Sequence, residues 1–336
     1  ADQSADRRQN GKYHKRKMKK IAIITPGGDA PGMNACIRAV VRRAVTCGFE
    51  VVGVMNGYQG LIDGNLFRMG YRTVGGIIHH GGTILKSSRC AEIKTPSGLS
   101  KAVKTLKKNK IENLIVIGGD GSIKAAEKIS KSGIPSICIP ASIDNDVFGT
   151  DETIGFDTAI DTAVEAIDKI RDTATSFDRV FIIEVMGREH GFLAIEVALA
   201  SGAEFVLVPE IKYNINKIVD ELKKDQKKKK TSEVIVFAEG CGDAKKVAKQ
   251  IFDSTRIDVK VSILGYIQRG GNPSARSRNL ASRFGSAAVD LISKGSKNRV
   301  IVLRKGEITS LPIKKVISGK KKIDIRSLKL VEKLAV

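Results

Sequence analysis

Residues 114–146 read LIVIGGDGSIKAAEKISKSGIPSICIPASIDND, and this stretch contains the repeating unit of the fold. Leu114–Ile117 and Ser136–Ile139 are short β-branched runs without polar alternation, which predicts strands buried on both faces. The segment between them predicts a helix that begins after GGDGS and runs through Ile129. A strand, a helix and a strand in this order predict a parallel pair joined by a crossover helix.

The same alternation extends in both directions along the chain. We expect helices at 35–47 and 193–201, and a longer one from about 157 to 171 that leads from one domain into the other. We expect further strands at 21–24, 51–54, 180–185, 205–208, 234–237, 259–264 and 300–303, the last of which closes the series. The predicted fold class is α/β, with two doubly wound, mainly parallel-sheet domains and the active site between them. In such sheets, ligands bind beyond the carboxyl ends of the strands.

The charge of the chain is unusual but confined to a few segments. The 336 residues include 58 Lys and Arg against 36 Asp and Glu, a formal net charge of +22. Most of the excess lies in residues 1–20, 223–230 and 294–336, and none of these segments interleaves aromatic with basic residues. Solvated tails and a surface helix end explain this pattern better than a nucleic-acid partner.

Composition also limits where the protein works. No apolar run approaches the roughly 18 residues that a membrane helix needs. The five cysteines are scattered and contain no CxxC, which favours a reducing, intracellular setting over a disulfide framework. Residues 1–17 are polar, and we expect them to be a leader or disordered extension before a native start at Met18.

Three loops that follow predicted strands carry chemistry. TPGGDAPGMN (25–34) and IGGDGS (117–122) each place glycines before a helix, where free N–H groups can bind phosphate. An Asp within such a loop suits Mg²⁺, although a helix cap is a common alternative. PASIDND (140–146) places carboxylates where a general base could act, although Asx residues also favour simple turns.

Arginine recurs beside glycine at the ends of predicted strands. VMGR (185–188) and QRGG (268–271) both follow strands, and Arg89 and Arg179 lie at element ends. Arginine recognises phosphate through two parallel hydrogen bonds. A single surface arginine is ordinarily only solvated, but four in this arrangement favour an anionic ligand.

Taken together and in order, these motifs resemble the 6-phosphofructokinase family, in its bacterial ATP-dependent form. The resemblance runs from about Lys19 to the C-terminal region and rests on GGDAPGMN, IGGDGS, IDND, VEAIDKIRDT (164–173), EVMGRE and LGYIQRGGNPSA (264–275). It implies a glycolytic enzyme that transfers the γ-phosphoryl group of ATP to the 1-hydroxyl of fructose 6-phosphate with Mg²⁺. Positioning and charge neutralisation dominate that chemistry, which fits a site of one base, arginines and a metal.

The resemblance also implies roles for individual residues. Asp144 matches the general base, and Asp120 matches the carboxylate that holds Mg²⁺. The expected catalytic residues are Asp144, Ser142, Asp146 and Arg188. The expected nucleotide-binding residues are Gly28, Arg89, Cys90, Gly119, Asp120, Gly121 and Ser122. The expected substrate-binding residues are Ser142, Ile143, Asp144, Arg179, Met186, Gly187, Arg188, Glu239, Lys260, Tyr266 and Arg269, with Arg179 and Lys260 reaching a neighbouring subunit's substrate.

Departures from the family pattern bear on the donor and the sugar. The pyrophosphate-using branch commonly has Asp at the position of Gly121 and Lys at that of Ala141, so this chain resembles the ATP-using branch. Lys260 and Tyr266 stand where Arg and His are usual. Lysine keeps the charge but loses the guanidinium fork, and tyrosine cannot become cationic.

Regulation, assembly and domains are also implied by the resemblance. It implies a cytoplasmic homotetramer with ADP or phosphoenolpyruvate as effector, bound by Arg38, Arg42, Arg171, Glu204, Lys228 and Lys230, although Tyr71 replaces an expected Arg. It implies a nucleotide-binding domain of residues 18–154 and 267–317 and a sugar-phosphate domain of residues 155–266 and 318–336. The alternatives are a pyrophosphate-dependent phosphofructokinase, another GGDG-type kinase such as an NAD or lipid kinase, and a basic nucleic-acid-binding protein.

Overall fold

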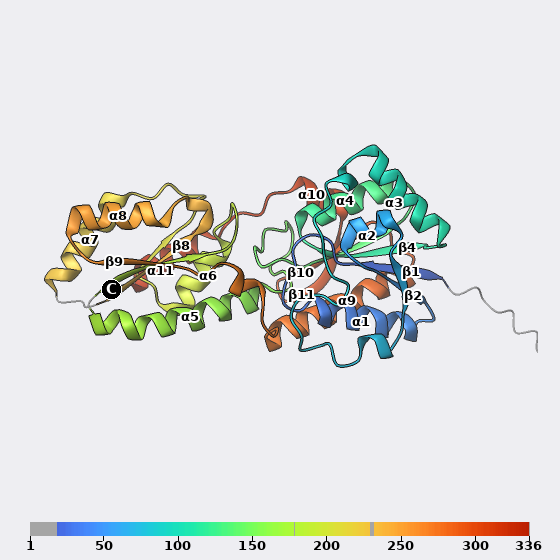
Figure 1. Ribbon diagram of the computed structural model, residues 1–336, viewed down its shortest axis with the longest axis horizontal. Helices are drawn as coiled ribbons and strands as arrows, with labels where there is room; N and C mark the ends of the chain where they lie inside the picture. The colour runs from blue at the N-terminus through green and yellow to red at the C-terminus, as the bar shows by residue number, and fades with distance from the viewer. Residues whose placement is uncertain (1–18, 178, 229–231, 336) are drawn as a thin grey trace, which may run out of the picture.

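The structure is a computed structural model that describes residues 19–177, 179–228 and 232–335 (Figure 1). The predicted leader at 1–17, the start at Met18 and the effector residue Lys230 lie outside these residues. The chain forms two α/β lobes that lie end to end, each built around its own sheet.

The larger sheet has seven strands in the order β11-β10-β5-β4-β1-β2-β3. Its strands are β1 (Lys20–Ile24), β2 (Glu50–Val54), β3 (Leu66–Met69), β4 (Asn113–Gly118), β5 (Ser136–Pro140), β10 (Arg299–Arg304) and β11 (Glu307–Pro312). All neighbouring pairs are parallel except β2 with β3 and β10 with β11, which are antiparallel and lie at the two edges of the sheet. The parallel centre is what the apolar runs predict.

Helices cover both faces of this sheet, and together they form what we call the seven-stranded lobe (Figure 1). One face packs on α1 (Met33–Thr46) and α9 (Ala275–Ser293); the other packs on α2 (Gly57–Asp63), α3 (Pro96–Lys108), α4 (Asp120–Lys131) and α10 (Ile313–Ser318). Alternate residues of one strand therefore enter different cores. Ile23 belongs to the same buried core as Phe284, whereas Ile24 belongs to the second core, with Leu106.

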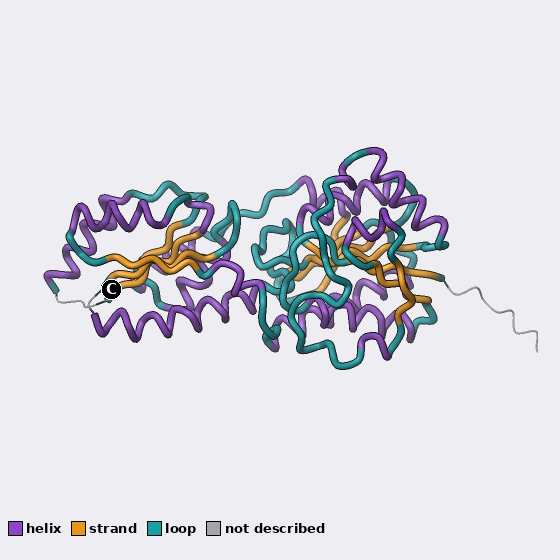
Figure 2. The backbone as a smooth tube through the Cα atoms, in the orientation of Figure 1, coloured by secondary structure: helices purple, strands orange, loops and turns teal. Residues whose placement is uncertain are grey.

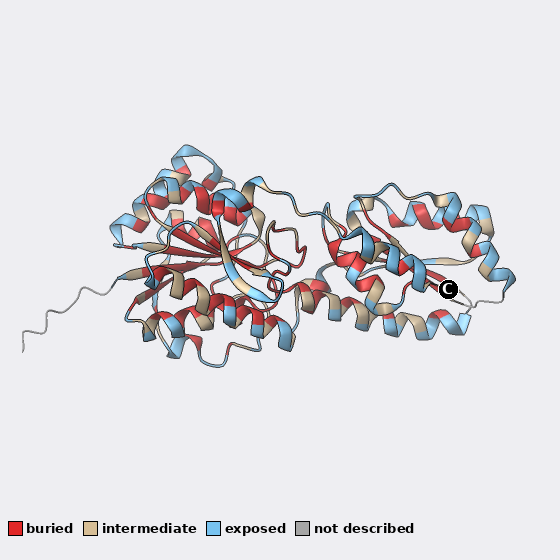
Figure 3. Cartoon of the chain, turned by 180° about the vertical axis from the view of Figure 1, so that it is seen from behind, coloured by how far each residue is buried: buried red, intermediate tan, exposed pale blue. Residues whose placement is uncertain are grey.

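The smaller sheet is entirely parallel, in the order β7-β8-β6-β9. Its strands are β6 (Val180–Val185), β7 (Phe205–Leu207), β8 (Glu233–Ala238) and β9 (Val259–Ile263). With α5 (Phe156–Phe177), α6 (Phe192–Ser201), α7 (Ile215–Lys227), α8 (Ala244–Thr255) and α11 (Ile325–Leu334), it forms the four-stranded lobe (Figure 1). Figure 3 shows the buried residues concentrated along the strands and the inner faces of the helices in both lobes.

The predicted fold class is confirmed, with corrections at its edges. The strand series does not close at 300–303, because β11 follows, and β3 was also not predicted. Both are antiparallel edge strands with polar and apolar residues mixed, so they lack the continuous apolar signal of buried strands. Helix α5 continues past residue 171 to Phe177, because no Gly or Pro interrupts it there.

The chain passes between the lobes at α5, at the segment after β9 that contains the short helix η4 (Gly265–Arg269), and at the segment from α10 to α11 (Figure 2). These passages bring the carboxyl end of β5 next to the carboxyl end of β6. The ends are joined by an ion pair between Arg188, after β6, and Asp144, after β5.

Candidate functional site

A cavity of about 1330 Å³ lies beyond the carboxyl ends of the central strands of the seven-stranded lobe. Parallel strands leave ligand sites at this edge. It brings together most of the residues that the sequence singled out: Gly28, Arg89, Cys90, Gly119, Asp120, Gly121, Ser122, Ser142, Ile143, Asp144, Asp146, Arg188 and Arg269.

One side of the cavity is a cradle for anions. Helix α4 begins at Asp120, directly after β4, so its unpaired N–H groups face the cavity. Ser122 donates from Oγ to the Pro26 carbonyl at 2.8 Å, which joins this helix start to the first glycine-rich loop. The buried Tyr58, which also lines the cavity, donates from Oη to the Ser122 carbonyl at 2.8 Å and so supports the same turn.

Sequence reasoning missed several basic residues on this side. The cavity is also lined by Lys86, Lys94, Lys124 and Lys128. Lys124 lies one helical turn after Asp120 and pairs with it, Nζ to Oδ2, at 2.5 Å. The spacing of Lys124 and Lys128 from Asp120 along one helix is a signal that could have placed them on the cavity face.

Asp144 is the most buried carboxylate of the cavity. Its side chain is 4% exposed, and Oδ2 lies 3.3 Å from Nε of Arg188. Burial raises the pKa of Asp144, and the carboxylates of Asp146 and Glu239 raise it further, while Arg188 and Arg269 oppose them. A carboxylate held in this way is poised to accept a proton.

The loop that carries Asp144 is held by its own hydrogen bonds. The Asp144 N–H donates to Oγ of Ser142 at 3.2 Å, and Thr153 Oγ1 donates to the Ser142 carbonyl at 2.5 Å. Asn145 has a positive φ of 51°, and its Nδ2 donates to the Asp151 carbonyl at 3.1 Å. These bonds fix the direction in which the carboxylates of the IDND motif point.

Across the cavity, a turn of the four-stranded lobe presents Arg188. Glu239 accepts from the N–H groups of Gly187 and Arg188 at 3.2 and 2.6 Å. The buried Gln268 accepts from the Met186 N–H at 2.9 Å. Met186, Gly187 and Glu239 thus hold the turn in place, although none of them lines the cavity itself.

Arg269 enters the cavity from η4 and packs against the first glycine-rich loop. A Cβ at Gly28 would come within 2.6 Å of an Arg269 guanidinium nitrogen, so only glycine fits there without movement. The guanidinium carbon lies 6.0 Å from the ring centroid of Tyr266, whose residue is 76% exposed. Tyr266 itself does not line the cavity.

Two predicted substrate residues lie elsewhere. Arg179 precedes β6 and Lys260 lies in β9, at the ends opposite the cavity. Both pair with Asp258, at 2.8 and 3.0 Å. Within one chain, the structure does not bring them to the other site residues.

The predicted effector residues are divided between the lobes. Arg38 and Arg42 lie on α1 in the seven-stranded lobe. In the four-stranded lobe, Arg171 donates to the carbonyls of Ser201 and Gly202 at 2.9 and 2.8 Å and lies 3.9 Å from Glu204. Lys228 lies at the end of α7, 3.6 Å from Asp225. These residues form no single site within one chain.

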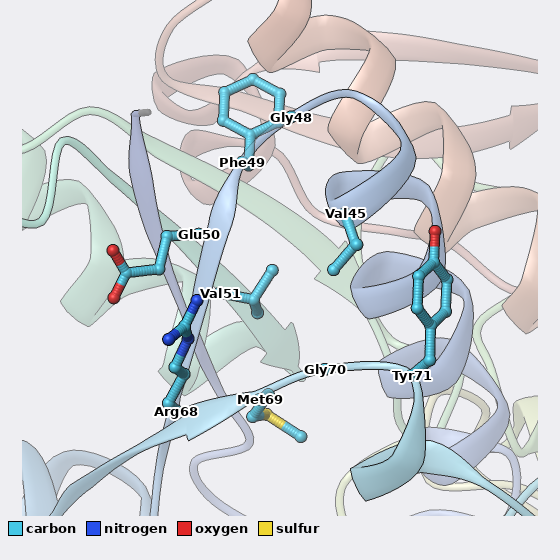
Figure 4. Close-up of a pocket in the computed structure, with 9 residues that line it drawn as sticks. All are labelled: Val45, Gly48, Phe49, Glu50, Val51, Arg68, Met69, Gly70 and Tyr71. Carbon is cyan, nitrogen blue, oxygen red and sulfur yellow. The ribbon is translucent and has the colours of Figure 1, made fainter. Parts of the chain in front are cut away.

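A second cavity, of about 440 Å³, lies at the β2–β3 edge beside the end of α1 (Figure 4). Figure 4 shows Glu50 and Arg68 on one side and Tyr71 on the other. The Tyr71 hydroxyl lies 3.3 Å from Oγ1 of Thr46 on α1. Tyr71 is the position where the family pattern expects an effector-binding Arg, but Arg38 and Arg42 do not line this cavity.

The main cavity fits a magnesium ion. Among the residues described, Oδ1 of Asp144 and Oδ1 of Asp146 are buried without a hydrogen-bond partner, and both residues line the cavity with Asp120. Within that same part of the chain, no group of three or more His, Cys, Asp or Glu could hold a metal alone. Mg²⁺ commonly takes one or two carboxylates and completes its shell with water and phosphate oxygens.

The fold and the cavity define a class: an α/β phosphotransferase in which a phosphate cradle on one lobe faces a carboxylate–arginine pair between lobes. Residues 20–292 match the family model described as "Phosphofructokinase". The chain therefore belongs to the phosphofructokinase family, and that prediction is confirmed. Among the described residues, no helix is long and apolar enough to cross a membrane.

Curated relatives share nearly the whole chain. It is 49% identical over 319 residues to an ATP-dependent 6-phosphofructokinase of Clostridioides difficile, covering 95% of this chain and 100% of that protein. It is 47% identical, with the same coverage, to an ATP-dependent 6-phosphofructokinase of Shouchella clausii.

Solved structures share the fold. The phosphofructokinase of Pichia pastoris in the T-state matches with a TM-score of 0.85 and 33% identity, over 90% of this chain and 35% of that chain. A pyrophosphate-dependent phosphofructokinase of Marinobacter aquaeolei matches with a TM-score of 0.82 at 23% identity, over 94% of this chain and 91% of that chain. The second similarity shows the fold alone.

Proposed function

We propose that this protein is an ATP-dependent 6-phosphofructokinase, which makes fructose 1,6-bisphosphate from fructose 6-phosphate. The observation that carries the proposal is the buried Asp144, paired with Arg188 and sharing one cavity with the start of α4. The named relatives at 47% and 49% identity support the same activity. Nucleic-acid binding would account for the charge but for none of these contacts.

In this proposal, Asp144 accepts the proton of the sugar 1-hydroxyl as that oxygen attacks the γ-phosphorus of ATP. The bond from the γ-phosphorus to the bridging oxygen breaks, and ADP leaves. Arg188 holds the carboxylate at 3.3 Å and offers positive charge beside the reacting oxygens. Ser142 accepts from the Asp144 N–H at 3.2 Å and keeps the base aimed into the cavity. Such transfer depends mainly on positioning and electrostatic stabilisation.

The nucleotide phosphates lie, in this proposal, at the start of α4. Gly119 and Gly121 present backbone N–H groups there, and Ser122, Gly28, Arg89 and Cys90 also line the cavity. Asp120, with Asp146 nearby, would hold Mg²⁺, which when bound neutralises charge on the transferring phosphates.

ATP rather than pyrophosphate is the proposed donor. A Cβ at Gly121 would meet nothing within 4 Å, so this position borders open space in the cavity. A carboxylate there would occupy the space and repel a nucleotide phosphate. The pyrophosphate-dependent alternative is less supported, since two solved enzymes of that kind are 23% and 22% identical to this chain, against 47% and 49% for the ATP-dependent relatives.

We also propose that the enzyme assembles as a homotetramer, in which a neighbouring subunit completes the sugar-phosphate site. Arg179 and Lys260 carry cationic groups at the amino ends of the strands, opposite the cavity of their own subunit. The same edge strand, β9, exposes Ile263 at its carboxyl end and continues into the exposed Tyr266 and Ile267. Exposed apolar side chains at a strand edge suit contact with another copy.

The effector residues are divided within one chain, since Arg38 and Arg42 lie on one lobe and Arg171, Glu204 and Lys228 on the other. In the proposed assembly, residues of two neighbouring subunits together form the effector site. ADP or phosphoenolpyruvate, bound between subunits, is the proposed effector. The proposed nucleotide domain, 18–154 with 267–317, matches the members of the larger sheet, and the sugar-phosphate domain, 155–266 with 318–336, those of the smaller. The five free cysteines suit the proposed cytoplasmic location.

The test is a coupled assay that detects fructose 1,6-bisphosphate, run with fructose 6-phosphate and Mg²⁺. Parallel reactions contain ATP or pyrophosphate as the donor. We expect turnover with ATP and little with pyrophosphate. Turnover with pyrophosphate alone would reverse the donor assignment, and turnover with neither would reject the proposed activity.

A further inference from the structure

A half-buried lysine lies where the chain crosses from α10 to α11. Lys321 donates from Nζ to the Asp151 carbonyl at 3.1 Å, and Nζ lies 5.1 Å from the ring centroid of Phe192. Asp151 belongs to the loop of the seven-stranded lobe that follows the IDND motif, whereas Phe192 begins α6 in the four-stranded lobe. One ammonium group therefore contacts both lobes.

The Asp151 carbonyl connects Lys321 to the proposed base. The same oxygen accepts from Nδ2 of Asn145 at 3.1 Å, and Asn145 directly follows Asp144. On its other side, Asp151 is fixed to the β10–β11 hairpin, because its N–H donates to the Leu303 carbonyl at 2.8 Å. The Lys305 N–H also donates to Asp151 Oδ2 at 2.6 Å. Lys321 thus donates to the same carbonyl oxygen that holds the side chain of Asn145.

The three carboxylates near Lys321 differ in whether they already have another partner. The carboxylates that face it are those of Asp151, Asp146 and Glu152. Glu152 already pairs with Arg276 at 2.6 Å, and Asp151 accepts from a backbone N–H. Asp146 lines the main cavity, and its buried Oδ1 has no hydrogen-bond partner among the described residues. The lysine charge therefore acts first on Asp151 and next on Asp146, the one of these three carboxylates that lines the main cavity.

We propose that Lys321 is a positioning residue for phosphoryl transfer, which ties the interlobe crossover to the loop that carries Asp144 and Asp146. The inference rests on the proposed function, because it assigns Lys321 a part in placing the base of that reaction. Without the ammonium, Asn145 keeps one bond to Asp151 and Asp144 keeps its ion pair with Arg188, but the loop loses its contact with the interlobe crossover. Since small displacements of a reacting group have large rate effects, the loss falls on kcat.

The site also predicts how the contribution depends on pH. Burial lowers the pKa of Lys321 to about 8, against the opposing effect of Asp151, Asp146 and Glu152. Below that pH the ammonium is charged, and above it the amine is neutral. The lysine contribution to kcat is therefore present below about pH 8 and lost as the pH rises through that value.

The experiment compares Lys321→Met with Lys322→Met in the full-length enzyme. Lys322 is the exposed neighbour, and methionine keeps most of the length of either side chain without its charge. For Lys321→Met we expect kcat to fall about tenfold while the KM for ATP changes less than about twofold. For Lys322→Met we expect wild-type kinetics, and thermal melts establish that both variants are folded.

Lys321→Arg supplies the second readout. Arginine stays charged across the accessible pH range. Lys321→Arg should therefore have the wild-type kcat at neutral pH, and the alkaline limb of its kcat–pH profile should lie at higher pH than that of the wild-type enzyme. An unchanged limb, or a folded Lys321→Met with wild-type kcat, overturns the inference. If Lys321→Met does not fold, the Lys321→Arg profile alone decides. A wild-type enzyme that does not phosphorylate fructose 6-phosphate would instead reject the proposed function.

Discussion

The two lobes contribute opposite kinds of side chain to one cavity. The seven-stranded lobe supplies Asp144, whose side chain is 4% exposed, whereas the four-stranded lobe supplies Arg188, whose side chain is 57% exposed. Burial adjusts the proton affinity of the carboxylate, while exposure leaves the guanidinium free to meet a ligand. The difference fits the proposed roles, in which one lobe fixes the base and the other supplies a cation for the substrate.

The four-stranded lobe shows a second contrast, between the ends of its own sheet. At the carboxyl end, Arg188 lies in the cavity; at the amino end, Arg179 and Lys260 share Asp258. The lobe thus offers cations at both ends of β6. In the proposed assembly, one end serves its own cavity and the other serves a neighbour.

The largest expected effect comes from removing the base. We expect Asp144→Ala to lower kcat about 10³-fold, because general-base catalysis contributes in the transition state. Nucleotide affinity, measured by calorimetry, should be retained. Asp63→Ala, which removes an exposed carboxylate on α2, is the matched control. Near-normal kcat in Asp144→Ala would exclude the role of base.

A smaller effect is expected from adding charge to the cradle. Gly121→Asp should lower kcat/KM for ATP about a hundredfold, because like charges placed together cost several kcal/mol. Gly121→Ala is the matched control, since a Cβ there meets no atom within 4 Å. If Gly121→Asp and Gly121→Ala have equal kcat/KM for ATP, a carboxylate at position 121 does not repel the nucleotide, and Gly121 no longer favours ATP as the donor.

The contrast between the ends of β6 can be tested by changing its amino end. Arg179→Ala and Lys260→Ala should each raise the KM for fructose 6-phosphate about tenfold, as expected for loss of a charged hydrogen bond to phosphate. Lys260→Arg restores the guanidinium fork and should lower that KM.

Mixed subunits decide which cavity these residues serve. Inactive Asp144→Ala subunits, reassembled with Arg179→Ala subunits, should regain low-KM activity. They do so because some cavities combine an intact Asp144 with a neighbour's intact Arg179. No recovery in confirmed hybrids would mean that Arg179 does not act across the interface.

The smallest effect concerns the pKa of the base. Because burial raises the pKa of Asp144, the acid limb of kcat/KM should lie above the ordinary range of a carboxyl group, and activity should fall as the pH falls through it. Asp146 contributes to the increase, so Asp146→Asn should move the limb to lower pH. A limb that moves upward would contradict the assigned direction.

Much of the fold follows from local sequence. The apolar runs at 21–24, 114–117 and 136–139 become central parallel strands, because continuous β-branched runs can be buried on both faces. The edges β3 and β11 could not be predicted in this way. Their side chains face solvent in part, so the apolar pattern weakens where pairing with a neighbouring strand decides the structure.

The residues of the site can likewise be divided into those that the sequence predicts and those that it does not. The glycine-rich loops and the IDND motif identify which residue types handle phosphate, since their positions after strands depend only on the order of elements along the chain. The lysines of α4 and the tie from Lys321 to Asp151 were not predicted. Nothing local distinguishes Lys321 from its neighbours Lys320 and Lys322.

The sequence by itself therefore determined the alternation of strands and helices, the loops that carry phosphate chemistry, and the family. Only the tertiary structure decided that Asp144 is buried against Arg188, and that Arg179 and Lys260 both pair with Asp258. The physical reason is that burial and proximity depend on how the lobes meet. That arrangement is set by contacts between residues far apart in the chain, which local patterns do not record.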